Sequence, residues 1–105
     1  MEISPSLFHF LLVLLKPLHG YQIMQEVEKA SGGELTMGAG TCYGLIARCL
    51  QEKLIELVEE VDRKKIYRVT RKGRDMLQDE IDRMQKQLNK TKDYLGEIYD
   101  QSIKV

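Results

Sequence analysis

The sequence predicts a mainly α-helical fold with a small β-hairpin and a long C-terminal helix. Apolar residues recur with helical spacing in three segments before residue 52. Two short stretches of β-branched and aliphatic residues follow, separated by a charged segment, which is typical of a hairpin. The remaining residues carry an apolar heptad repeat. We therefore expect one small domain over residues 1–70 and a single helix over residues 71–105.

The first helix is predicted to run from Ser4 to about Leu15, ahead of Pro17. Ser4 has a hydroxyl that can cap the helix, and Pro5 suits the first turn, where its missing N–H costs nothing. The helix is apolar on nearly every side, so we expect it in the core or partly against another subunit. Its apolar run, Phe10 to Leu15, is too short to span a bilayer and lacks the basic flank of a secretory signal. These features predict a cytoplasmic protein.

A second helix is predicted from His19 to about Ala30. Its apolar positions are Tyr21, Ile23, Met24 and Val27. We expect His19 to organise the start of the helix, and Gly32 and Gly33 suit the left-handed backbone that follows a helix end. Leu35 to Met37 is expected to add a short strand.

A third helix is predicted after Gly38, Ala39 and Gly40. At about 100° per residue, six apolar residues share an arc of roughly 160° that we expect to be buried. They are Cys42, Tyr43, Leu45, Ile46, Cys49 and Leu50. The opposite arc holds Thr41, Gly44, Ala47, Arg48 and Gln51. Small residues there allow close approach to a surface, and Arg and Gln side chains can bond guanine and adenine edges. The solvated face of an ordinary amphipathic helix explains the pattern equally well.

The segments that flank this helix offer groups to an anionic partner. Gly38–Gly40 has no side-chain cap, so its N–H groups can meet a phosphate, with a plain flexible turn as the alternative. Leu54–Val58 and Ile66–Val69 are predicted strands, and Glu59–Lys65 is their charged tip. The cationic residues of this tip are Arg63, Lys64 and Lys65. Although the formal net charge is zero, nine basic and five acidic residues fall within positions 38–74, which suits phosphate neutralisation.

Neither a metal site nor an enzyme active site is predicted. Cys42 and Cys49 are about 10 Å apart along one helix, too far to form a disulfide with each other. As free thiols on a buried face they suit a reducing cytosol, with redox sensing as the alternative. His9 and His19 belong to no cluster with metal-ligand spacing, and no nucleophile has a base at motif spacing. We expect no cofactor.

The last helix is predicted to begin after Thr70, a capping residue, and to extend to about Ser102. Gly73 is a weak point in its first turn. The heptad positions are Leu77, Ile81, Met84, Leu88, Thr91, Leu95 and Ile98. The predicted helix is about 45 Å long at 1.5 Å per residue. One small domain cannot bury an apolar stripe along such a helix by itself. We therefore expect a homodimer in which this helix pairs with its counterpart or lies across the partner's first helix.

At the level of residues the chain resembles the PadR family of transcriptional regulators. The resemblance rests on HGYQI from His19, GTCY from Gly40, LQEKLIE from Leu50 and KKIYRVTRKGRDML from Lys64, in the family's order and spacing. It implies a winged helix-turn-helix domain and, in the smaller subfamily, a single C-terminal dimerisation helix. It also implies a cytoplasmic dimer that binds a roughly palindromic operator in double-stranded DNA, represses, and releases DNA on a signal such as a small-molecule effector.

Under this resemblance the third helix recognises DNA and the hairpin is the wing. The predicted DNA-binding residues are Tyr21, Gly40, Thr41, Tyr43, Gly44, Arg48, Gln51, Arg63, Lys64 and Lys65. We expect the Tyr43 ring to be packed with its hydroxyl toward a phosphate, and Tyr67 to be core. The chain departs from the family at Gly44, where proline is usual, and at Lys53, where glycine is usual; the wing is also short.

Two points stay open at this level. A winged helix can serve as a protein-binding adaptor without DNA, because fold does not settle function. Phe8, Met24 and Met84 could line an adaptable apolar pocket for an effector at a dimer interface, although methionines at helical spacing more often belong to the core.

Overall fold

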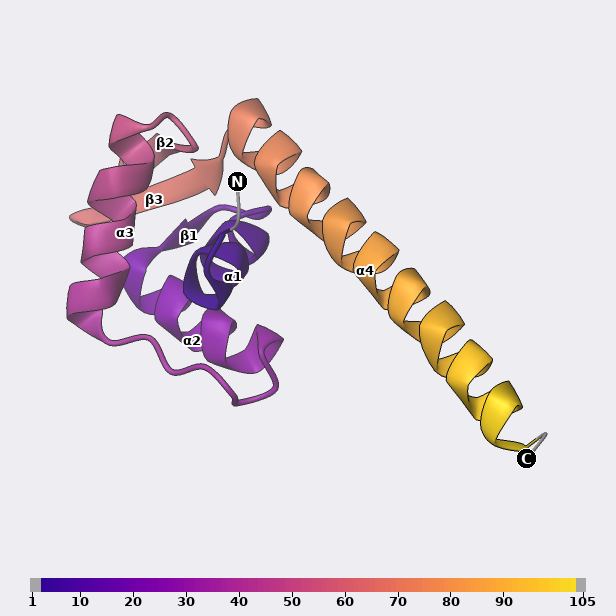
Figure 1. The fold of residues 1–105 in the computed structure, drawn as a ribbon. Helices are drawn as coiled ribbons and strands as arrows, with labels where there is room; N and C mark the ends of the chain where they lie inside the picture. Colours follow the sequence, from indigo (N-terminus) through magenta and orange to yellow (C-terminus); the bar gives the residue numbers. More distant parts are fainter. Residues whose placement is uncertain (1–2, 104–105) are drawn as a thin grey trace.

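The computed structural model describes the backbone of residues 3–103 and the side chains of residues 3–100. The elements, in chain order, are α1 (Pro5–Val13), β1 (Leu18–His19), α2 (Gly20–Ala30), α3 (Ala39–Gln51), β2 (Ile55–Val61), β3 (Lys64–Val69) and α4 (Arg71–Ile103). The first three helices and the sheet form a domain from which α4 projects (Figure 1). This is a mainly helical winged-helix domain with a long C-terminal helix, as the sequence predicted. No helix in the described part is long and apolar enough to cross a membrane.

Helix α1 supplies the centre of the core. Ser4 caps it as predicted, because its Oγ accepts a hydrogen bond from the Leu7 N–H at 3.1 Å. The buried side chains Phe10, Leu11 and Leu14 lie among apolar residues of α2, α3, the sheet and the start of α4. The Leu14 carbonyl also accepts from the Val69 N–H at 2.8 Å. Thus Leu14, the residue that follows α1, ties the end of β3 to the helical layer.

The sheet has three antiparallel strands in the order β1-β3-β2. Its short strand is Leu18–His19, which pairs with Tyr67 and Ile66 of β3. The predicted strand at Leu35–Met37 is wrong. There the Leu35 N–H donates instead to the Ser31 Oγ at 2.9 Å, and the apolar side chains of the segment serve packing rather than strand pairing.

The wing is a longer hairpin than predicted, with a tighter tip. Strands β2 and β3 extend through most of the charged segment that was expected to be a loop, and only Asp62 and Arg63 remain between them. Both have positive φ, 50° and 65°, the conformation of a two-residue type I′ turn. Val58 is the extra residue of a bulge between Leu57 and Glu59. The charged side chains of this segment are exposed on paired strands and at the turn, and strand pairing restrains their backbone more than a loop would.

Helices α2 and α3 both end in a Schellman motif. After α2, the N–H of Gly32 bonds the Lys29 carbonyl and the N–H of Gly33 bonds the Glu28 carbonyl, at 3.1 and 2.8 Å. After α3, the N–H groups of residues 53 and 54 bond the carbonyls of residues 50 and 49 in the same pattern. The left-handed residue is Gly32 in the first motif but Lys53, with φ 61°, in the second. A glycine would adopt this backbone conformation without a side-chain penalty.

Lys53→Gly is expected to stabilise the domain. A side chain in the left-handed region costs about 1 kcal/mol or more, and glycine avoids this cost. Because glycine also gains freedom in the unfolded chain, we expect the free energy of unfolding to rise by only about 0.5–1 kcal/mol in urea titrations. Lys53→Ala is the control, since it removes the same charge and keeps the strain. An equal gain in both variants would assign the effect to the charge.

Helix α4 begins as predicted and is held to the domain by its first turns. The Thr70 Oγ1 accepts from the Gly73 N–H at 3.1 Å and donates to the Lys53 carbonyl at 2.7 Å. Gly73 is a close-packing position rather than a weak point, because a Cβ there would lie 2.2 Å from the Leu54 carbonyl oxygen. Leu77 is only 3% exposed and belongs to the core of its own chain. It is therefore not available to a partner, contrary to its predicted place in the dimer seam.

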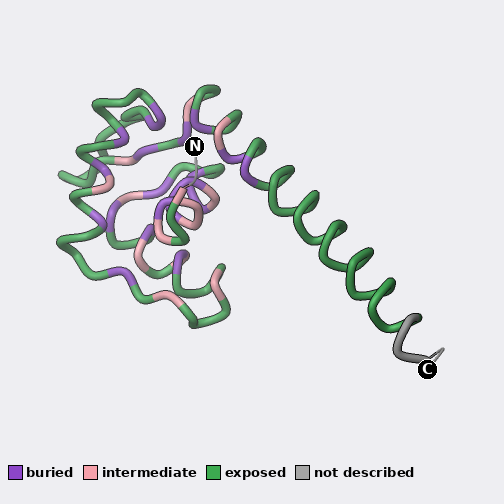
Figure 2. Tube along the Cα trace, viewed as in Figure 1, coloured by how far each residue is buried: buried purple, intermediate pink, exposed green. Residues whose placement is uncertain are grey.

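Beyond Leu77, α4 leaves the domain. Glu80 is buried, and its carboxylate accepts hydrogen bonds from the Arg83 guanidinium that hold its pKa below the usual value. From residue 81 to residue 100 every described side chain is exposed, and Figure 2 shows this change from buried to exposed along the helix.

Candidate nucleic-acid interface

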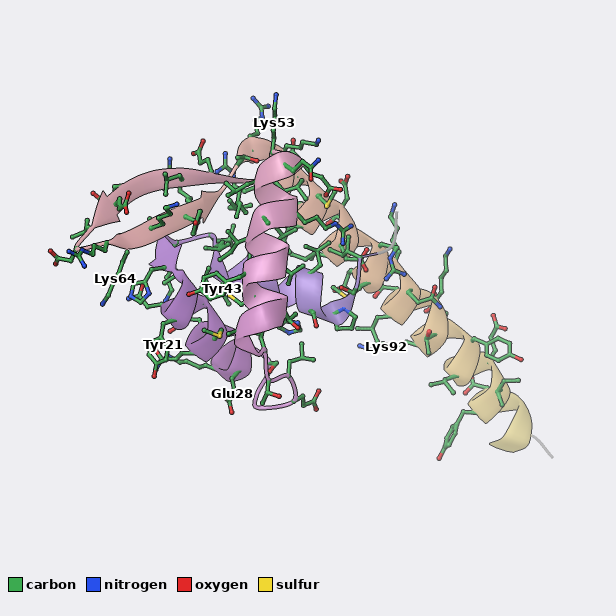
Figure 3. All side chains as sticks on the ribbon, turned by 90° about the vertical axis from the view of Figure 1, so that its left-hand side faces the viewer. Tyr21, Glu28, Tyr43, Lys53, Lys64 and Lys92 are labelled. Atoms are coloured by element: carbon green, nitrogen blue, oxygen red, sulfur yellow. The ribbon has the colours of Figure 1, made fainter. Side chains whose placement is uncertain are left out.

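All ten residues predicted to contact DNA are exposed. They come from α2, α3 and the wing, and Figure 3 shows Tyr21, Tyr43 and Lys64, one from each element, on the same side of the domain. Helix α3 lies at the surface between α2 and the wing. The arrangement therefore gathers the predicted residues on one side, although they are separated by more than 40 positions in the sequence.

The buried face of α3 is narrower than predicted. Cys42, Ile46 and Cys49 are buried, and at about 100° per residue they span roughly 60° of the helix. Tyr43 and Leu50, at one edge of the predicted arc, are 58% and 38% exposed. The Tyr43 ring is thus more exposed than predicted, because only one side of it contacts the domain and the other side faces an open cleft.

Tyr43 rests on the start of α2. A Cβ added to Gly20 would lie 3.0 Å from the Tyr43 hydroxyl oxygen and 3.2 Å from its ring, so the glycine makes room for this tyrosine. Gly20 is buried, and its carbonyl accepts a hydrogen bond from the Cys42 Sγ at 3.6 Å. The first turn of α2 and the first turn of α3 are therefore in direct contact.

A cleft of about 420 Å³ lies between α2, α3 and the wing. It is lined by His19, Gly20, Tyr21, Tyr43, Arg63, Lys64, Lys65 and Tyr67. We call it the wing cleft. It combines three cations with the rings and hydroxyls of three tyrosines, a set that can neutralise a phosphate and donate hydrogen bonds to it. Among the described residues, no ion pair involves Arg63, Lys64 or Lys65.

Three residues of the cleft lining, His19, Gly20 and Tyr67, were not predicted from the sequence. His19 caps α2 as expected, with its backbone N–H donating to the Gln22 Oε1 at 3.1 Å, yet the residue also contributes to the cleft lining. Tyr67 is 8% exposed, which confirms it as core, and burial raises the pKa of its phenol. The HGY motif carried the signal, since its residues adjoin one another at the cleft.

The outward face of α3 is polar and shallow. Gly40 and Gly44 have nothing within 4 Å of an added Cβ, so their small size is not required by packing inside the chain. Arg48 Nε lies 3.7 Å from a Glu52 carboxylate oxygen, and both side chains are about half exposed. Such a surface pair contributes little to stability, so Arg48 can exchange it for another acceptor. Gly38, the N-cap of α3, makes no side-chain capping bond.

Both cysteines belong to the core of the domain. Both are free and fully buried on the inner face of α3. Burial is the main cause that raises the pKa of the Cys42 thiol, and it raises the pKa of Cys49 to about 11 with a smaller contribution from Glu52. Thiols in this state are poor nucleophiles at neutral pH, which disfavours the redox-sensing alternative. Within the described residues no group of three His, Cys, Asp or Glu side chains could hold a metal ion.

Of the three residues suggested to line an apolar effector pocket, Phe8 and Met84 line the same groove, and Met24 does not. A groove of about 380 Å³ between α1 and α4 includes Phe8, His9 and Met84 in its lining. Met24 packs against the core of the domain instead.

Comparison with known proteins gives consistent matches. The model of the transcriptional regulator PadR-like family matches residues 10–79. The chain is 38% identical over 68 residues to an uncharacterized 37.1 kDa protein in transposon Tn4556 of Streptomyces fradiae, and it spans only 19% of that protein's length. A PadR-like transcription factor from Bacteroides fragilis is 30% identical with a TM-score of 0.63, covering 85% of this chain and 87% of that one. Bacillus subtilis PadR in complex with operator DNA is similar in fold, with 24% identity, a TM-score of 0.59 and coverage of 70% and 45%.

Proposed function

Because this chain belongs to the transcriptional regulator PadR-like family, we propose that it binds operator DNA as a homodimer and represses transcription from a roughly palindromic site. In this proposal the winged-helix domain reads the DNA and α4 joins two copies. A signal such as a small-molecule effector releases the DNA.

The wing cleft is the observation that carries this proposal. Arg63, Lys64 and Lys65 line it together with the exposed rings of Tyr21 and Tyr43. Cations with tyrosine hydroxyls suit the sugar-phosphate backbone, whereas an apolar protein partner would leave the cations desolvated at a large cost. A DNA backbone in this cleft would lie beside α3 and so bring its outward face to a groove.

Base reading is assigned to α3. Its outward face presents Thr41, Arg48 and Gln51, and Gly40 and Gly44 leave space for close approach. Arg48 would bond guanine and Gln51 adenine in the major groove. Since the hairpin tip is only two residues long, the wing would contact phosphate rather than reach deeply into the minor groove.

A homodimer is supported by the exposed apolar residues of α4. A palindromic operator presents two half-sites about 34 Å apart, which suits two copies related by a two-fold axis. The operator-bound structure of Bacillus subtilis PadR shows that a relative with this fold binds operator DNA, and we extend that partner to this chain.

The test uses a bound fragment selected from the source genome and a random duplex of equal length. Arg48→Ala should weaken binding to the selected fragment by about 1–3 kcal/mol and change binding to the random duplex much less. Arg48→Lys is the control, since it keeps the charge but loses the two-pronged bond, and it should lose most of the same discrimination. Equal losses on both duplexes would remove base reading from Arg48.

The adaptor alternative predicts a different salt response. DNA binding through several phosphates must weaken steeply between about 50 and 200 mM salt. If the affinity for the selected fragment proved independent of salt, or no fragment were selected, the proposal of a DNA-binding regulator would fail and the adaptor would take its place.

A further inference from the structure

Contact with duplex DNA does not account for the exposed tyrosine rings of the wing cleft. Tyr21 and Tyr43 are 62% and 58% exposed, and both line the cleft beside the cations of the hairpin tip (Figure 3). A DNA backbone can accept hydrogen bonds from their hydroxyls, but the bases of a duplex are stacked on one another and offer no free face to an aromatic ring. A free nucleotide has both phosphates and an unstacked base. Such a ligand would use the cations and the rings together.

We propose that the wing cleft binds a free nucleotide with two or more phosphates, which competes with DNA for the same residues. The base would stack on the Tyr43 ring with Tyr21 beside it, and the phosphates would meet Arg63, Lys64 and Lys65. The competition rests on the proposed DNA binding, whereas the binding of the nucleotide itself does not. A nucleotide in this cleft would release DNA by occupying part of its binding surface directly.

The wing cleft has the size of a small-molecule site. Its volume of about 420 Å³ falls within the range of roughly 300–1,000 Å³ that such sites occupy, and it exceeds the 380 Å³ of the groove between α1 and α4. Its walls come from three elements, namely the start of α2, the start of α3, and β3 with the turn that precedes it. A cleft with walls from three elements removes more of a small ligand from water than a flat surface does.

The Tyr43 ring is held in a position suited to stacking. One side of the ring contacts the domain, because a Cβ added to Gly20 would lie 3.2 Å from ring atoms and 3.0 Å from the hydroxyl oxygen. The other side faces the cleft. The ring is therefore supported from behind, and a base can stack on its free face at little cost in side-chain freedom.

The buried side of the cleft can donate a hydrogen bond to a phosphate oxygen. Tyr67 is 8% exposed and lines the cleft together with Tyr43. Burial raises the pKa of the Tyr67 phenol, and the nearby Tyr43 and Glu60 raise it further. The Tyr67 hydroxyl is therefore a neutral donor at neutral pH.

The cations lie closer together than contact with a single DNA phosphate requires. Arg63, Lys64 and Lys65 are consecutive, and none of the ion pairs among the described residues involves them. Successive phosphates of a DNA strand are separated by a whole nucleotide, and each carries one negative charge. A terminal phosphate carries roughly −1.5 to −2 charge and three acceptor oxygens, and a di- or triphosphate links it directly to further phosphates. Three adjacent cations suit such a chain of linked phosphates.

Calorimetric titration of the full chain with ATP, adenosine and tripolyphosphate tests whether one ligand uses both halves of the cleft. ATP should bind about 10-fold more tightly than either of the other two probes, because only ATP can stack a base and neutralise the cations together. GTP should bind like ATP, since stacking tolerates any base. Tripolyphosphate binding as tightly as ATP would reduce the cleft to an anion site. That result, or no binding of ATP, would overturn the proposal.

Variants of the tyrosines test the place of the base. Tyr43→Ala should weaken ATP binding by roughly 10-fold and leave tripolyphosphate binding unchanged, whereas Tyr43→Phe keeps the ring and should retain ATP. Tyr21→Ala, which removes the neighbouring ring, should also weaken ATP binding. Tyr94→Ala is the matched control, because Tyr94 is 63% exposed but lies on α4 outside the cleft. If ATP bound equally to the native chain and to both cleft alanine variants, the base would not lie in the wing cleft.

Competition is measured by the anisotropy of a labelled duplex, with the selected fragment and the random duplex in parallel. ATP should weaken the binding of both duplexes alike, because phosphate contacts carry no sequence information directly. Sodium sulfate at equal ionic strength is the control for screening. Normal salt-dependent DNA binding with equal effects of ATP and sulfate would refute the competition and leave the proposed function intact. ATP binding by a chain that selects no DNA would refute the proposed function and leave the nucleotide site.

Discussion

Gly73→Ala is expected to destabilise the protein more than alanine at any other of its glycines, because the added Cβ meets its nearest neighbour there at the shortest distance. The new Cβ would lie 2.2 Å from the Leu54 carbonyl oxygen and 2.5 Å from the Val69 Cγ2. The first neighbour is backbone that ends the α3–β2 connection, so it cannot rotate away as a side chain would. We expect the free energy of unfolding to fall by about 3 kcal/mol, at the upper end of overpacking costs.

Urea titrations followed by circular dichroism measure this loss, at one fixed protein concentration because the stability of the proposed dimer would depend on it. Gly96→Ala is the control. It lies in the exposed part of the same helix, nothing is within 4 Å of its added Cβ, and alanine should raise stability by about 0.5–1 kcal/mol there. If both alanines stabilised the protein, the close approach of α4 to Leu54 would be wrong.

Removing the three cations of the wing cleft is expected to have the largest effect on DNA binding. The variant combines Arg63→Gly, Lys64→Ala and Lys65→Ala. Glycine is chosen at Arg63 because its φ of 65° favours it, so Asp62 and the glycine keep the type I′ turn. Because this variant can no longer neutralise about three phosphates, the slope of log affinity against log salt should fall by about 3, and affinity at moderate salt by roughly 100-fold.

The loss of affinity should be similar on selected and random duplexes, because phosphate contacts carry no sequence information directly. Lys86→Ala, Lys90→Ala and Lys92→Ala together form the control, since they remove the same charge from the exposed part of α4. If this control reduced the slope as much as the wing variant, the effect would come from total charge and the wing cleft would have no special role.

Local signals predicted most of the elements. The caps at Ser4 and Thr70, the glycines after α2 and the helical spacing of apolar residues act within about four residues, so they can be recognised along the chain. They led to four helices, a hairpin and the ordered motifs of the family, and the family match over residues 10–79 confirms the last.

Features that depend on residues far apart in the sequence were missed or wrongly predicted. The pairing of Leu18 with Tyr67 joins residues 49 positions apart, and a two-residue strand has no local sequence pattern that predicts it. The charged wing residues were expected in a loop because charge usually indicates solvent. Strand pairing keeps charged side chains in solvent just as well, so composition could not decide between the two.

The order of the helices, the position of the hairpin and the family to which the chain belongs could all be recognised in the residues alone. Three features needed the folded chain: Tyr43 faces a cleft, Gly73 contacts Leu54, and Leu77 belongs to the domain while Ile81 is exposed. One cause accounts for all three. Helical spacing defines which residues share a face, but whether that face meets core, solvent or a partner depends on backbone that folds back from elsewhere in the chain.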